Sequence, residues 1–309
     1  VLVYAETAFQ SKDNKMTHVS EKERIIIDGG AGVGRVTKPG LDQPVGAAAI
    51  NSVPRQMITH EVLQVCEEFE YSGLVKVTIS IPKGVELAEK TFNPRLGIEG
   101  GISVLGTSGI VVPMSEDALI ASIRTEMKMR HENGAEYLLV TPGNYGRDFL
   151  KNKEDIRSED SMKCSNYVGE TLDSAVNLGI KGILFVAHIG KFIKVSGGIM
   201  NTHSRCADSR AELMCAHAIR AGAGLDIARR LLNTITTEEA VDILAEEGFL
   251  EKTMEQVIEK VHYYLQHRCG GALATEAILF SNNQGWLGQT EGAQEQQYQE
   301  HRPKERLPI

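Results

Sequence analysis

Two apolar stretches decide the fold class: Tyr137-Leu138-Leu139-Val140 and Ile183-Leu184-Phe185-Val186. Neither alternates with polar residues, so each predicts a strand that is buried on both faces. Helices are predicted before the first strand, over about 115–133, and between the two strands, over about 166–178. Such strands alternating with helices indicate an α/β fold. We expect a Rossmann-like, doubly wound parallel sheet domain over residues 97–230.

The chain before residue 97 follows another pattern. Residues 75–81 alternate apolar and polar side chains, which predicts a half-buried strand of an antiparallel sheet on a helix layer. Residues 35–55 contain three prolines and two glycines, a spacing that disfavours both a helix and a central strand and predicts a long shaped loop. We therefore expect an α+β domain with a half-buried sheet over residues 1–96, completed by C-terminal elements.

The remainder is predicted to be mostly helical. Thr236-x-x-Glu239 is a capping box that begins a helix ending at Gly248, and a second helix runs from Leu250 to Arg268. We expect a C-terminal helical region over residues 231–288. Residues 289–309 are polar and lack a core pattern, which predicts a frayed tail.

Composition excludes several classes of protein. The 309 residues carry 33 Lys and Arg against 41 Asp and Glu, and this net charge of −8 disfavours nucleic-acid binding. No apolar run is long enough to cross a membrane, and residues 1–10 lack the pattern of a signal peptide. The five cysteines never occur as Cys-x-x-Cys, so we expect a reduced, cytoplasmic protein without a disulfide framework.

Two motifs resemble known ligand sites but are incomplete. Gly30-x-Gly32-x-Gly34 has its third glycine one position too early for a dinucleotide fingerprint, and Pro39-Gly40 prevents the helix that would follow. A structural glycine turn is the favoured interpretation. His203-x-x-Cys206-x-Asp208 lacks a fourth ligand, so we expect a hydrogen-bonded loop and no protein metal site.

The stronger candidates follow the continuous strands, because open α/β sheets bind ligands beyond the carboxyl ends of their strands. Residues 141–148 hold Gly143, Asn144 and Gly146, and a purely structural turn is an equally good interpretation of them. Residues 106–109 form another glycine-containing loop that either binds a ligand or caps a turn. His188 shares a strand-end loop with Lys191 and Lys194, which favours contact with an anion. Taken alone, these residues indicate a soluble α/β ligand-binding protein, with an enzyme of group transfer favoured.

Longer stretches carry a resemblance to a known family. They include Gly-Gly-Ile-Met-Asn-Thr-His-Ser at 197–204 and His-Ile-Gly-Lys at 188–191, together with residues 30–41, 44–55, 91–109 and 165–169. The sequence resembles the cobalt-precorrin-5B C(1)-methyltransferase family of anaerobic cobalamin biosynthesis from about residue 26 to about residue 275. Members begin with a Gly/Thr-rich segment and an alanine-rich helix. We expect that this chain lacks that segment, and that the site residues named here are incomplete if it contributes.

The resemblance implies methyl transfer from S-adenosylmethionine to C1 of a cobalt-corrinoid tetrapyrrole, giving cobalt-precorrin-6A. The cobalt arrives inside the substrate. Because that substrate carries many carboxylates, local cations must recognise it. The candidate substrate-binding residues are Arg35, Lys38, Arg55, Arg95, His188, Lys191 and Lys194.

For the methyl donor, loop chemistry gives the candidates Thr107, Ser108, Gly109, Gly143, Asn144 and Gly146. His203 is a candidate for catalytic proton transfer, and a role in holding its loop is equally plausible. Two rival functions remain: a corrinoid carrier without catalysis, and another α/β nucleotide-dependent transferase. A homo-oligomer is left open.

Overall fold

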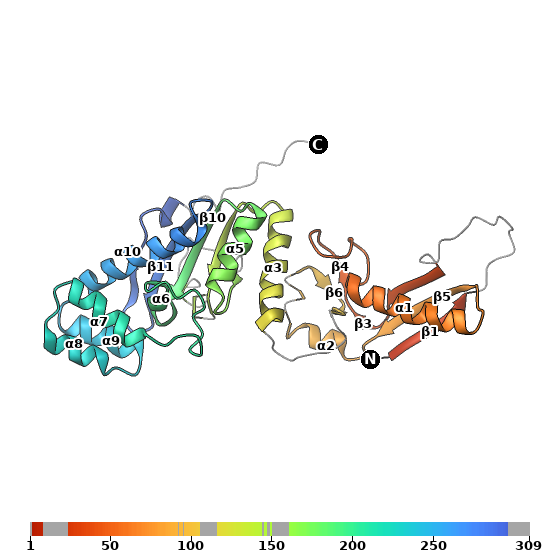
Figure 1. The fold of residues 1–309 in the computed structure, drawn as a ribbon, viewed down its shortest axis with the longest axis horizontal. Helices are drawn as coiled ribbons and strands as arrows, with labels where there is room; N and C mark the ends of the chain where they lie inside the picture. Colours follow the sequence, from red (N-terminus) through yellow and green to blue (C-terminus); the bar gives the residue numbers. More distant parts are fainter. Residues whose placement is uncertain are drawn as a thin grey trace. The chain divides into compact units, whose positions relative to one another are not determined.

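A computed structural model describes residues 2–8, 24–91, 93–94, 96–105, 116–143, 145–146, 149 and 161–295 (Figure 1). The chain forms two compact units, Val1–Asn133 and Gly134–Ile309. This division falls later than the expected boundary at 96/97. Helix α3 (Glu116–Glu132) belongs to the first unit, where its neighbour Asn133 donates a hydrogen bond to the carbonyl of Pro39.

The second unit contains a five-stranded sheet in the order β12-β11-β10-β8-β9. Strands β8 (Tyr137–Thr141), β9 (Met162–Lys163), β10 (Gly182–His188) and β11 (Ala274–Ser281) are parallel, and β12 (Gly285–Gln289) runs antiparallel to β11. The predicted strands at 137–140 and 183–186 are therefore neighbours in a parallel sheet. The mixed α/β class is confirmed, while its Rossmann-like character stays a prediction.

Both faces of this sheet are buried. One face presents Leu139, Leu184, Val186 and Phe280, and Ala293 and Phe149 pack against it. The opposite face presents Phe185, which packs against Phe192 of α6 (Ile189–Val195). Helix α10 (Leu250–Cys269) packs against β11 and against α5 (Val168–Leu178). The prediction that β8 and β10 are buried on both faces is thus confirmed.

The remaining helices of this unit form a group in Figure 1: α7 (Arg210–Arg220), α8 (Leu225–Leu232) and α9 (Thr237–Glu246). They lie in the chain between β10 and β11. The expected helical region at 231–288 is therefore corrected, because it also contains β11, which completes the sheet beside β10. The expected frayed tail at 289–309 is corrected for its first part, since Ala293 is fully buried against the sheet, and residues 296–309 lie outside the described residues.

The first unit contains a three-stranded sheet in the order β1-β5-β2. Strand β5 (Leu74–Ser80) is half-buried, as predicted. It pairs antiparallel with β1 (Leu2–Ala8) and parallel with β2 (Ile25–Gly29), so the sheet is mixed and the expected antiparallel pairing holds on one side only. Val75, Val77 and Ile79 are buried against α1 (Ser52–Glu68). Helix α1 also begins inside the loop predicted for 35–55, because its proline, Pro54, lies in the first turn, where a helix tolerates it.

The glycine-rich stretch after β2 serves backbone packing. Strand β3 (Gly32–Val33) pairs with β7 (Gly101–Ile102), while β4 (Arg35–Val36) pairs with β6 (Ile98–Glu99). Gly32 has a φ of +76°, and a Cβ there would lie 1.8 Å from the carbonyl oxygen of Ile81. Helix α2 (Gly84–Ala88) begins at the same crossing. The motif is a structural turn in which two segments of backbone meet.

Candidate functional site

A cavity of about 290 Å³ opens at the carboxyl ends of β8 and β10. Its walls come from four segments: the loop after β8, the end of β10 with the start of α6, the first residue of α7, and the start of α9. The lining residues are Pro142, Gly143, Tyr145, Gly146, Val186, His188, Gly190, Lys191, Arg210, Thr236, Thr237 and Glu238. Four of the predicted site residues, Gly143, Gly146, His188 and Lys191, are therefore brought together.

The position of this cavity follows from the strand order. In chain order the strands run 2-1-3-4-5 across the sheet, so the chain extends the sheet first on one side of β8 and then on the other. Where the direction reverses, the connections after adjacent strands leave toward opposite sides and open a crevice. That point lies between the ends of β8 and β10, which is where the cavity is found.

His188, at the end of β10, has a close polar neighbour at each ring nitrogen. The backbone N–H of Gly190 donates to Nδ1 at 3.0 Å, so Nδ1 carries no proton, and any proton of the neutral ring is on Nε2. Nε2 lies 2.6 Å from Oε1 of Glu238, a short contact that is not aligned as a hydrogen bond. The ring also packs edge-on against Phe280, and its centroid lies 5.6 Å from that of the tilted Tyr145 ring.

Glu238 connects three segments through its carboxylate. It lies in the first turn of α9, where a negative charge suits the helix dipole. Oε1 accepts a hydrogen bond from the backbone N–H of Asn282 at 3.0 Å, and Oε2 accepts one from Asn283 at 3.2 Å. Together with the His188 contact, these bonds fix α9 to the end of β10 and to the β11–β12 turn.

Lys191 lines the cavity and binds two backbone carbonyls beside it. Its Nζ donates to the carbonyl of Pro142 at 2.5 Å and to that of Ser165 at 3.2 Å, so it joins the segments that follow β8 and β9. Burial lowers the pKa of this ammonium group. Cys164 lies nearby, and burial raises the pKa of its thiol to about 12. The lysine therefore holds the segments after β8 and β9 together.

The two glycines of the loop after β8 differ in their surroundings. A Cβ built on Gly146 would lie 2.7 Å from the carbonyl oxygen of Val186, closer than a real Cβ tolerates. Among the described residues, a Cβ on Gly143 would meet the end of the Lys191 side chain, at 3.7 Å from Nζ, which is ordinary contact. Gly146 is thus required by the close approach of the loop to β10, whereas Gly143 leaves room on the cavity wall.

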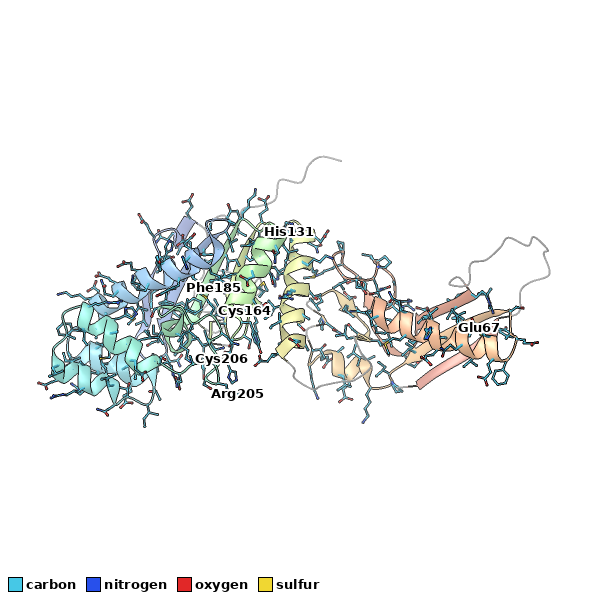
Figure 2. The ribbon with its side chains drawn as sticks, in the orientation of Figure 1. Glu67, His131, Cys164, Phe185, Arg205 and Cys206 are labelled. Atoms are coloured by element: carbon cyan, nitrogen blue, oxygen red, sulfur yellow. The ribbon has the colours of Figure 1, made fainter. Side chains whose placement is uncertain are left out.

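Two other predicted residues lie outside this cavity. Lys194 is 3 % exposed, and its Nζ donates to the carbonyls of Thr202 and Ala207 at 3.1 and 2.7 Å. His203 accepts a hydrogen bond at Nδ1 from the backbone N–H of Arg205, a bond that fits the loop-holding interpretation. Figure 2 shows Arg205 and the exposed Cys206 together on this loop.

The predicted cations of the first unit differ in how many protein partners they already have. Arg55 donates to the carbonyls of Ile27 and Ile50, both at 2.8 Å, and burial lowers its pKa. Arg35 is exposed and lies 2.8 Å from Asp28, and its hydrogen bond lowers the pKa of that carboxyl. Lys38 is exposed. Arg95, Thr107, Ser108, Gly109 and Asn144 lie outside the described residues.

Sequence reasoning missed the contribution of α9. Thr236 does cap this helix, since its hydroxyl accepts from the backbone N–H of Glu239 at 3.1 Å, as the capping box predicts. The capping box also predicts that Thr237 and Glu238 lie in the first turn of this helix. Nothing in the sequence indicated that this turn returns to the end of β10, because the contact spans about 50 residues of chain.

Within the part of the chain that the structure describes, no group of three His, Cys, Asp or Glu side chains could hold a metal ion. The same residues contain no helix long and apolar enough to span a membrane.

Comparison with known proteins gives the family. Residues 3–113 match the family model described as CbiD, and residues 201–291 match the model of the CbiD C-terminal domain. A cobalt-precorrin-5B C(1)-methyltransferase from Ruminiclostridium cellulolyticum is 49 % identical over 262 residues, which cover 85 % of this chain and 68 % of that protein. The chain belongs to the CbiD family.

A second curated relative agrees with this assignment. A protein of the same name from Alkaliphilus metalliredigens is 45 % identical over 264 residues, covering 85 % of this chain and 69 % of its own length. The solved structure of a cobalamin biosynthesis protein (cbiD) from Archaeoglobus fulgidus is 20 % identical, covers 80 % of this chain and 61 % of that chain, and aligns with a TM-score of 0.26. Glu238 and His203 fall inside the match to the CbiD C-terminal domain.

Proposed function

We propose that this CbiD-family chain transfers the methyl group of S-adenosylmethionine to C1 of cobalt-precorrin-5B, giving cobalt-precorrin-6A in anaerobic cobalamin biosynthesis. The observation that carries this proposal is the 49 % identity, over 85 % of the chain, to a relative named for that reaction. The cytoplasm is the expected location, on the strength of the cysteine pattern.

We infer that the donor binds in the cavity between the ends of β8 and β10, and that the sheet is doubly wound and Rossmann-like. The switch-point position supports both statements. The residues present suit a nucleoside-sized group. Gly143 has no side chain to fill the space beside it, and Tyr145, which is 61 % exposed, offers an aromatic ring for stacking. The cavity volume is near the lower end of the range for small-molecule sites, so part of the ligand would extend beyond it.

S-adenosylmethionine would supply an activated methyl group on its sulfonium. The task of the protein is then to hold that methyl group and the accepting carbon in line and to exclude water. Pro142, Gly143 and Tyr145 would form the donor wall, and the Glu238–His188 contact would keep that wall in place. His203 stays a candidate proton acceptor, although its Nδ1 already receives a backbone hydrogen bond.

Recognition of the substrate carboxylates is assigned to cations that have donors to spare. Lys38 is exposed and fits this role. Arg35 is also exposed, but it pairs with Asp28 and donates to the carbonyls of Gly29 and Gly46, so it would exchange one of these contacts for a substrate carboxylate. Arg55, Lys191 and Lys194 donate to backbone carbonyls, which favours positioning roles for them. Arg95 remains a proposal on the family resemblance.

The direct test is anaerobic incubation of the purified chain with cobalt-precorrin-5B and S-adenosylmethionine carrying an isotope-labelled methyl group. We expect the label in the tetrapyrrole, at C1, by mass spectrometry and NMR. A reaction without the chain is the control. Binding of the corrinoid without label transfer would contradict the proposal and favour a carrier.

A further inference from the structure

The cavity contains a buried hydroxyl group that has no hydrogen-bond partner among the described residues. Thr237, the first residue of α9, lines the cavity and is 6 % exposed, and its buried Oγ1 has neither a donor nor an acceptor. Buried polar groups in native proteins are almost always paired, so an unpaired one requires an explanation. A partner supplied by a ligand is one such explanation.

Comparison with two other threonines shows that Thr237 differs in its position at the cavity, and not merely in lacking a partner. Thr253 on α10 and Thr275 on β11 are also fully buried with an unpaired Oγ1. Neither contributes to the wall of the cavity. Thr237 does, and its Oγ1 lies 3.6 Å from the place where a Cβ on Gly190 would be. The hydroxyl is therefore close to Gly190, in the first turn of α6, which also lines the cavity.

The neighbours of Thr237 indicate what kind of ligand group it would meet. The adjacent Glu238 carboxylate would repel an anion, and its two oxygens already accept backbone hydrogen bonds. Of the cations that line the cavity, Lys191 donates to two carbonyls and Arg210 pairs with Asp208 at 2.6 Å. The rest of the wall, including Pro142, Tyr145 and Val186, is largely apolar. A neutral, mostly apolar group with a polar edge fits these surroundings.

We propose that the Thr237 hydroxyl hydrogen-bonds the nucleoside end of the methyl donor, at its base edge or a ribose hydroxyl. A threonine hydroxyl both donates and accepts, so it can pair with either group. This inference rests on the proposed function, because it takes the donor to bind in this cavity. It assigns Thr237 a ligand contact that the methyl-transfer reaction does not by itself require.

The test is calorimetric binding of three probes, S-adenosylhomocysteine, adenosine and methionine, to the full chain and its variants. Thr237→Val removes the hydroxyl and keeps the shape, and we expect affinity for the first two probes to fall about three- to tenfold. The melting temperature should not fall, since no protein hydrogen bond is lost. Thr237→Ser should bind within about twofold of the unsubstituted chain, and Thr253→Val is the matched control with unchanged affinity.

The outcomes separate the contact from the function. Equal binding by Thr237→Val, or an equal loss in Thr237→Ser, would overturn the contact while donor binding stands. A loss confined to methionine would overturn the nucleoside assignment. If the unsubstituted chain binds neither S-adenosylhomocysteine nor adenosine, the proposed function itself is contradicted, and the contact with it.

Discussion

Glu238 joins α9 to the end of β10 and to the β11–β12 turn. Its two oxygens accept the N–H groups of Asn282 and Asn283, and one of them also meets His188. Glu238→Gln turns one acceptor into an NH₂ group that faces a backbone donor. We expect the free energy of unfolding to fall by about 1–3 kcal/mol, measured by urea titration.

The control for this variant is Glu246→Gln. Glu246 is also on α9 but forms only an exposed ion pair with Arg230, at 3.3 Å. Such pairs contribute up to about 1 kcal/mol, so the control should be close to the unsubstituted chain. Equal losses in the two variants would mean that Glu238 does not hold the wall.

His217 provides a test based on pH. It is buried on α7, and its Nε2 lies 2.8 Å from Oγ of Ser196. Burial, reinforced by the charges of Arg220 and Lys260, lowers its pKa from 6.5 to about 4. Below pH 6.5 the unfolded chain therefore binds a proton that the folded chain does not, and this difference in proton binding makes unfolding easier as the pH falls.

The free energy of unfolding should thus include a loss of about 2 kcal/mol from His217 between about pH 7.5 and pH 5. His217→Gln should remove this part of the pH dependence, measured by denaturant titration at several pH values. His267→Gln, at an exposed position on α10, should keep it. An unchanged slope in His217→Gln would show that the buried histidine does not contribute.

Among the elements, the loop after β8 depends on one glycine rather than two. Gly146→Ala places a Cβ against the carbonyl of Val186, whereas among the described residues Gly143→Ala meets only the end of the Lys191 side chain. We expect Gly146→Ala to lower the melting temperature by several degrees, consistent with about 1–3 kcal/mol of overpacking, and Gly143→Ala to leave it almost unchanged. Equal melting temperatures in thermal scans would refute the close approach.

The elements that could be predicted are those with local signals. The helices at 116–132, 237–246 and 250–269 carry caps, terminal charges or glycine stops, and the strands β8 and β10 are continuous apolar runs. Strand β11 was missed because its position beside β10 is set by pairing across about 90 residues. The site follows the same division: Gly143, His188 and Lys191 follow predicted strands, but Thr237 and Glu238 depend on a distant return of the chain.

At the scale of the whole molecule, β11 makes the folding of the second unit depend on its C-terminal residues. Strand β11 lies between β10 and β12, and its residues from Thr275 onward are mostly buried. Deletion of residues 272–309 would expose the edge of β10 and the apolar face of α10. We expect loss of cooperative unfolding by circular dichroism. Deletion of 296–309 alone leaves every described strand and helix in the chain and is the control, which should retain cooperative unfolding.

The central claim is that the methyl donor binds between the carboxyl ends of β8 and β10. The most direct measurement is a crystal structure of the chain with S-adenosylhomocysteine. The account predicts ligand density bounded by Gly143, His188 and Thr237, with the Thr237 hydroxyl within hydrogen-bond distance of the nucleoside. Ordered ligand anywhere else, for example against the first unit, with this cavity unchanged, would contradict it.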